Sequence, residues 1–184
     1  DETPQKIVSR AETTRSILIT PITLDAFARY AMPSGDQLGR GPLPPVAGEE
    51  TKYWVFWNVH GTTNPIHNLV IDAELGDHVR FTGRQSVSQD AGVRDDASTH
   101  SISWNAPELA STFSPASRIV GIAFELAINP DPSQIGSVPI LIKNARATGT
   151  DKTTGAFVSA AGQTVTTDLP GDPMAAGKAM VTAP

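Results

Sequence analysis

The chain has 184 residues, which is enough for one domain with a sizeable hydrophobic core, and its formal net charge is −5. Lys and Arg are scattered rather than clustered, which argues against a nucleic-acid partner, and no apolar run is long enough to predict a membrane span. The absence of cysteine excludes disulfides and zinc–cysteine sites, whereas 15 Gly, 15 Pro and many β-branched residues favour a turn-rich β fold.

The first β-rich segment covers residues 16–24 (SILITPITL), after a polar stretch with weak periodicity. Alternating apolar residues predict a strand here. Pro21 cannot donate a hydrogen bond to a sheet, so this strand is expected to lie at a sheet edge or to break at that residue.

The next two segments predict irregular structure. Residues 26–31 are expected to form a short helical turn, because Phe27 and Tyr30 are three residues apart. Four prolines and four glycines between residues 32 and 48 predict a long connection without regular structure. We therefore expect residues 1–50 to form an N-terminal arm with a Pro/Gly-rich connection, and residues 51–184 to form the main domain.

From residue 51 onward the pattern predicts consecutive β-strands. In TKYWVFWNVH, Tyr53, Val55, Trp57 and Val59 share one face while Trp54 and Phe56 share the other. Because both faces are apolar, this segment is predicted to be a central strand. Trp57 is expected in the core. For Trp54 the alternatives are core packing, stacking on a sugar, or an apolar patch with Phe56 that a partner strand or subunit covers.

Further strands are predicted over residues 69–75, 79–82, 101–105, 120–128, 138–147, 156–168 and 178–182, with a long polar loop over residues 83–100. The sequence shows no alternation of strands with helices, so a parallel sheet is not predicted. The predicted fold class is therefore all-β, an immunoglobulin-like antiparallel β-sandwich with an N-terminal extension. Its expected core consists of Val55, Trp57, Val59, Leu69, Ile71, Trp104, Ile122, Phe124, Leu126 and Ile140.

An ordered series of short stretches lies between residues 53 and 173. These are YWVFWNV (53–59), NLVIDAEL (68–75), SISWN (101–105), AFELAINPDPSQIG (123–136), ATGTDKTTG (147–155) and TTDLPGDP (166–173). The series resembles the Ig-like conserved-repeat domains of large bacterial and archaeal cell-surface proteins. That resemblance implies an extracellular location and a structural or adhesive role, and it supplies no catalytic residues.

The chain contains no motif that selects a catalytic site. Gly-x-Ser-x-Gly, His-x-x-x-His and phosphate-binding loops are absent from the sequence, so we predict that the protein is not an enzyme and requires no cofactor. Calcium uses carboxylate ligands, and Asp95 and Asp96 in the polar loop are its candidates. The alternative is that these residues only start and cap turns.

Two functions from different classes follow. The first is an extracellular structural subunit that assembles with copies of itself or with other envelope proteins into a filament, sheath or surface layer. Its candidate assembly residues are Ile17, Leu18, Ile19, Trp54 and Phe56, because the first segment would complete a neighbour's sheet, unless it folds back on its own domain. The alternative is an adhesin repeat that binds glycan or protein through residues 83–100. The chain begins at Asp1, which either a cleaved signal peptide or a truncation would explain.

Overall fold

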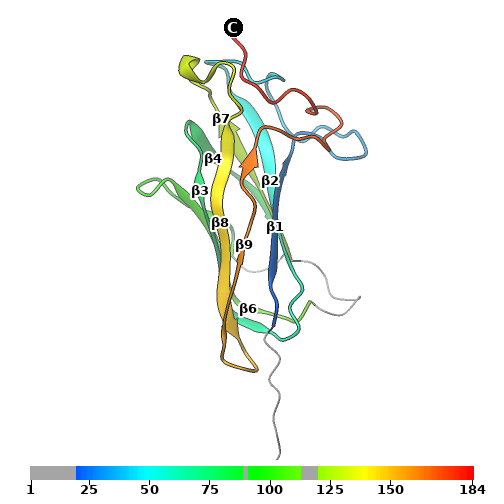
Figure 1. The fold of residues 1–184 in the computed structure, drawn as a ribbon, viewed down its shortest axis with the longest axis vertical. Helices are drawn as coiled ribbons and strands as arrows, with labels where there is room; N and C mark the ends of the chain where they lie inside the picture. The colour runs from blue at the N-terminus through cyan, green and yellow to red at the C-terminus, as the bar shows by residue number, and fades with distance from the viewer. Residues whose placement is uncertain (1–19, 89–90, 113–119) are drawn as a thin grey trace, which may run out of the picture.

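The computed structural model describes residues 20–88, 91–112 and 120–184, which fold into two antiparallel sheets packed face to face (Figure 1). The first sheet contains, in spatial order, β1 (Thr23–Arg29), β2 (Thr51–His60), β7 (Val120–Ile128) and β4 (Val79–Val87). The second contains β10 (Val165–Thr166), β8 (Ile140–Asp151), β3 (Ile66–Leu75), β6 (Ser101–Leu109) and β5 (Arg94–Asp96), and β9 (Phe157–Ala161) also pairs with β8. A short 3-10 turn, η1 (Pro132–Gln134), precedes β8.

The strand order confirms the predicted immunoglobulin-like sandwich. An immunoglobulin domain places strands A, B, E and D in one sheet and strands C, F and G in the other. Here β1, β2, β7 and β4 occupy the first set of places, and β3, β8 and β9 occupy the second. The strands β6 and β5 extend the second sheet beyond β3. In the described part of the chain no helix is long and apolar enough to cross a membrane.

The core lies between the inward faces of β2 and β7 and those of β3 and β6. Trp57 on β2 meets Phe124 on β7 edge to face, with ring centroids 4.8 Å apart. Of the ten predicted core residues, nine are at most 1% exposed, and Trp104 is among them. Ile140 is the exception: it is 37% exposed, so its assignment to the core was wrong.

Ile140 is the first residue of β8, a strand in which inward and outward positions do not alternate throughout. The pairing register between β3 and β8 shifts near Asn144, whose φ of 55° is left-handed. Such a bulge adds a residue to one strand and changes which face the preceding residues occupy. Leu141 and Ile142 are both fully buried although they are adjacent in sequence, so simple alternation does not give the face of Ile140.

The segment predicted as a helical turn over residues 26–31 is instead mostly strand β1. Every residue of β1 pairs with a residue of β2, and Leu24, Ala26 and Ala28 are buried in the core. Phe27 stacks on Phe56 across the two strands, with centroids 5.2 Å apart. Long-range pairing with an apolar strand therefore decides the conformation here. Of the strand predicted over residues 16–24, residues 16–19 lie outside the described residues.

Three other predicted boundaries change in the structure. The strand predicted over residues 79–82 continues to Val87, and residues 94–96 form β5, so much of the predicted loop over 83–100 is sheet. No strand forms over residues 178–182. That segment makes one isolated bridge, between Thr182 and Val46, and it is held against the end of the sandwich by hydrogen bonds with residues 136 and 137.

Candidate functional site: the outer face and free edge of the first sheet

Half-buried aromatic side chains lie on the outer face of β1 and β2. The register places Phe27 opposite Phe56 and Arg29 opposite Trp54, and all four side chains point away from the core. The Arg29 guanidinium lies 5.6 Å from the Phe27 ring centroid, a distance at which a cation attracts the ring face. Trp54 and Phe56, the two candidate assembly residues within the described chain, thus belong to one outward-facing surface.

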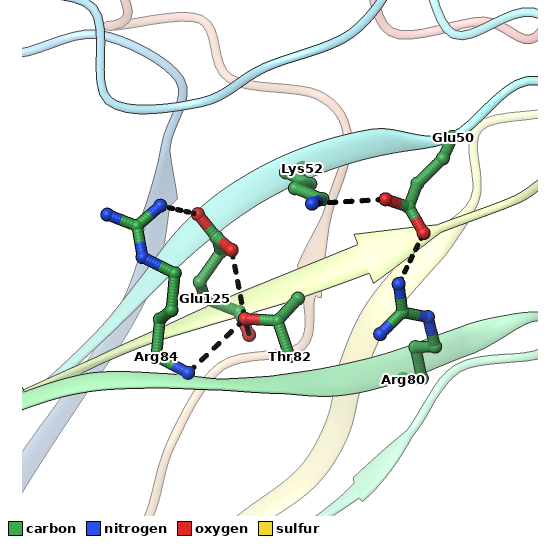
Figure 2. A network of polar contacts seen from close by, with 6 residues as sticks. All are labelled: Glu50, Lys52, Arg80, Thr82, Arg84 and Glu125. Atoms are coloured by element: carbon green, nitrogen blue, oxygen red, sulfur yellow. Dashed lines mark hydrogen bonds and ion pairs between the residues drawn. The ribbon is translucent and has the colours of Figure 1, made fainter.

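A buried carboxylate lies in the same surface. Glu125 on β7 is opposite Trp54 on β2, and its side chain is 0% exposed (Figure 2). Its carboxylate accepts a hydrogen bond of 2.9 Å from the Thr82 hydroxyl and one of 3.0 Å from Arg84 Nη1. The Arg84 guanidinium also lies 5.7 Å from the Trp54 ring centroid. One exposed arginine therefore covers both a buried anion and a tryptophan.

A bulge in β4 brings these two donors together. The pairing of β4 with β7 shifts between Phe81 and Gln85, so Thr82, Gly83 and Arg84 lie opposite the single residue Glu125. Gly83 has φ +86°, which glycine adopts without the steric cost that other residues incur. Sequence reasoning missed this site because it ended the strand at residue 82. The available signal was Glu125 itself, a charged residue within an otherwise apolar strand.

A second ion-pair group lies beside the first on the same face (Figure 2). Glu50 accepts a hydrogen bond from Arg80 and pairs with Lys52 at 3.2 Å. The hydrogen bond from Arg80 is the main reason that the pKa of Glu50 is lowered. Because all three side chains are at least 30% exposed, solvent screening leaves this group a small contribution to stability.

The two arginines of β4 provide a matched prediction. Arg84→Ala leaves the buried Glu125 carboxylate with one hydroxyl donor, so we expect a loss of about 1–3 kcal/mol of unfolding free energy. Arg80→Ala removes a pair between exposed groups and is expected to cost less than about 1 kcal/mol. Chemical denaturation of both variants checks this, and equal losses for the two would contradict the assigned role of Arg84.

The second feature of this sheet is the free edge of β1. Among the described residues, no strand pairs with the side of β1 that faces away from β2. A groove of about 290 Å³ runs along this edge, between residues 26–29 on one side and residues 163–172 on the other. Arg29 crosses its end by donating to the Gly171 carbonyl at 3.3 Å. Just beyond, the Asp172 carboxylate accepts the backbone N–H groups of Tyr30 and Ala31 and closes the groove.

The other described sheet edges are shorter or interrupted. β5 has three residues, all of them charged and exposed, and β10 has two residues with an irregular register. β4 is bulged, and the Gln85 side chain on this edge strand bonds the backbone of Val93. β9 has five residues. Proteins block edges by such devices, whereas β1 offers seven residues in unbroken register.

The chain enters β1 through an anchored threonine. The Thr20 hydroxyl donates to the carboxylate of Asp151, the last residue of β8 in the second sheet. Asp151 is 0% exposed and also accepts hydrogen bonds from Asn64 Nδ2 at 3.0 Å and from the backbone of Thr153 and Thr154. Burial alone would raise the pKa of Asp151, but these hydrogen bonds outweigh it and hold the pKa well below its usual value.

The lowered pKa of Asp151 predicts acid sensitivity. An unfolded aspartate has a pKa of about 3.9, so the unfolded state binds the proton more tightly than the folded state does. The stability that Asp151 contributes is therefore fully present above about pH 5, and it is lost as the pH falls toward the folded pKa. We expect the difference in melting temperature between the wild type and Asp151→Asn to shrink from pH 6 to pH 3. A difference in melting temperature that stays the same at every pH would contradict this expectation.

The remaining predicted site residues are not brought into one place. Ile17, Leu18 and Ile19 lie outside the described residues. Asp95 and Asp96 lie on β5, where Asp96 accepts from the backbone N–H of Ser98 at 2.8 Å and from its hydroxyl at 2.6 Å. The hydroxyl bond is the main reason that the pKa of Asp96 is lowered. Within residues 20–88, 91–112 and 120–184, no three His, Asp or Glu side chains gather to hold a metal ion.

No protein-family model matches the chain, and no curated protein matches it. Among solved structures it is similar to BcpA, the major pilin subunit of Bacillus cereus, at 13% sequence identity and a TM-score of 0.48, over 79% of this chain and 39% of the pilin. It is similar to the major pilin SpaD of Corynebacterium diphtheriae at 13% identity and a TM-score of 0.44, over 79% and 34%. A GH20 exo β-N-acetylglucosaminidase of Vibrio harveyi aligns at 8% identity and a TM-score of 0.35, over 79% and 18%. The chain spans less than half the length of each of these proteins.

Proposed function

We propose that this chain is a non-enzymatic structural subunit that assembles with copies of itself at the cell surface. The observation that carries the proposal is the edge of β1, which is seven residues long, is paired by no described strand on the side away from β2, and is bordered by a groove. Unpaired N–H and C=O groups on such an edge are satisfied when another strand is added. A contact between two different surfaces of the same subunit repeats from copy to copy, and it builds an open filament wherever the rotation between copies does not close a ring.

The outer face of the first sheet offers a second contact surface. Phe27 and Arg29 line the groove and also belong to the outward-facing aromatic surface with Trp54 and Phe56. A subunit that adds to the β1 edge would therefore also reach these aromatic side chains. By contrast, the adhesin alternative relied on a long loop over residues 83–100, and in the structure β4 and β5 take up part of that range.

Light scattering and negative-stain electron microscopy of the purified full chain test this function. We expect fibres or a ladder of oligomers as the protein concentration rises. The measurements are run with and without calcium, so that dependence on this ion is seen directly. A monomer of 19.4 kDa at every concentration, with and without calcium, would overturn the proposed function.

A further inference from the structure

We propose that the groove beside β1 receives residues 1–19 of a second copy of this chain as an added β-strand. This inference rests on the proposed function and names the occupant of its acceptor site. It makes the first sheet of each subunit a composite, with four strands from one copy and one strand from the next.

The shape of the edge suits an added strand. Pairing along β1 is regular from Thr23 to Arg29, and Asp172 closes the far end, so the acceptor has a defined length. The side chains on the inner side of the groove are apolar, namely Ala26 and Ala28 on β1 and Val165 and Leu169 opposite them. On the outer side, Phe27 is half-buried and continues the aromatic surface.

The sequence of the N-terminal segment matches these two sides. Ile17 and Ile19 alternate with Leu18, so a strand over these residues presents apolar side chains both to the inner wall and to Phe27. Isoleucine also favours extended backbone because its β-branched side chain fits the pleated surface. A second strand therefore supplies apolar contacts on both sides of the sheet, in addition to backbone hydrogen bonds.

The position of Thr20 disfavours the same segment folding back on its own β1. A hairpin of that kind would place Thr20 beside Thr23 in the plane of the first sheet. Instead, the Thr20 hydroxyl is bound to Asp151 at the end of a strand in the second sheet, and it accepts the backbone N–H of Asn64 at 3.3 Å. The chain is thus held out of the plane that a hairpin needs, and the groove remains for another copy.

The segment is long enough to pair along the whole length of β1. Nineteen extended residues reach about 60 Å, whereas pairing along a seven-residue strand uses about 23 Å of this length. Because Ile17, Leu18 and Ile19 directly precede the anchored Thr20, their entry into the groove of a second copy requires the two subunits to pack against each other near Thr20. β1 begins at the end of the sandwich opposite the C-terminus (Figure 1).

Crosslinking between single-cysteine variants tests the inference, because the chain has no native cysteine. Leu18→Cys is mixed with Gln163→Cys, whose side chain is exposed in the groove wall, and assembly proceeds before oxidation. We expect a covalent dimer of the two variants, since a disulfide requires the two Cα atoms to approach within about 7 Å. Asp77→Cys replaces Gln163→Cys in the control, because Asp77 is exposed and lies outside this groove.

The outcomes separate the inference from the function. The inference is supported if Leu18→Cys forms covalent dimers with Gln163→Cys and not with Asp77→Cys, and if Ile17→Cys or Ile19→Cys gives the same result. If fibres form but no arm position crosslinks to the groove, the inference is wrong and the function stands. A double variant Leu18→Cys/Gln163→Cys that closes within single chains at high dilution would place the arm on its own β1 and overturn the inference. If the chain stays monomeric under all conditions, both proposals fail.

Discussion

Replacing Phe124 with aspartate is expected to unfold the domain. Phe124 is 0% exposed at the centre of β7, where it contacts the rings of Trp57 and Phe81. The change removes a buried ring, which alone costs about 3–5 kcal/mol, and buries a carboxylate without a partner, which adds several more. Since domains of this size are stable by about 5–15 kcal/mol, most of the protein should be unfolded. Circular dichroism and the dispersion of the proton NMR spectrum measure this.

The same substitution at Phe157 is the matched control. Phe157 lies on β9 and is 67% exposed, so Phe157→Asp removes little buried surface and keeps the new charge in water. We expect its unfolding free energy to stay within about 0.5 kcal/mol of the wild type. A folded Phe124→Asp variant with the wild-type melting temperature would show that β7 is not the central strand of the core.

Replacing Asp172 with alanine is expected to have the next largest effect. One carboxylate oxygen accepts the N–H groups of Tyr30 and Ala31 at 2.7 and 2.8 Å, and the other accepts those of Met174 and Ala175, both at 2.9 Å. Burial would raise the pKa of Asp172, but these four bonds outweigh it and lower the pKa. Each buried N–H left without a partner costs about 1–3 kcal/mol, and water entry recovers part of that.

We therefore expect Asp172→Ala to lose about 3–5 kcal/mol of unfolding free energy. Amide hydrogen exchange should accelerate at Tyr30 and Ala31, because their N–H groups lose their acceptor. Asp77→Ala is the control, since Asp77 is exposed and should change stability by less than about 0.5 kcal/mol. Amide exchange that stays slow at Tyr30 and Ala31 in the Asp172→Ala variant would mean that another group accepts the hydrogen bonds of these N–H groups.

Asp172 also determines where the proposed acceptor groove ends. Its bonds to Tyr30 and Ala31 occupy the backbone donors that immediately follow β1, so an added strand cannot extend past them. Loss of the carboxylate would open this end and let the added strand shift along β1. Register is then set by side-chain contacts alone, which is a weaker constraint when one side of the sheet is exposed.

The sandwich and most of its core could be predicted from local patterns in the sequence. Alternation of apolar residues in β2 and β7 is a local property, because neighbouring side chains in a strand point to opposite faces. It identified both strands, the inward positions of Trp57 and Phe124, and the outward positions of Trp54 and Phe56. The face that a side chain occupies follows from its position along its own strand and does not depend on which strands lie beside it.

The pairing of strands, the bulges and the buried carboxylates could not be predicted from local patterns. Residues 26–31 carried a helical spacing, yet pairing with β2 made most of them strand. The bulge opposite Glu125, the clamp made by Asp172 and the anchor between Thr20 and Asp151 join residues 41 to 142 positions apart. Sequence periodicity does not predict such contacts, because they depend on which strand edges and loop ends meet when the two sheets pack. The edge of β1 that no described strand pairs became apparent in the same way, from the strand order of the assembled sheet.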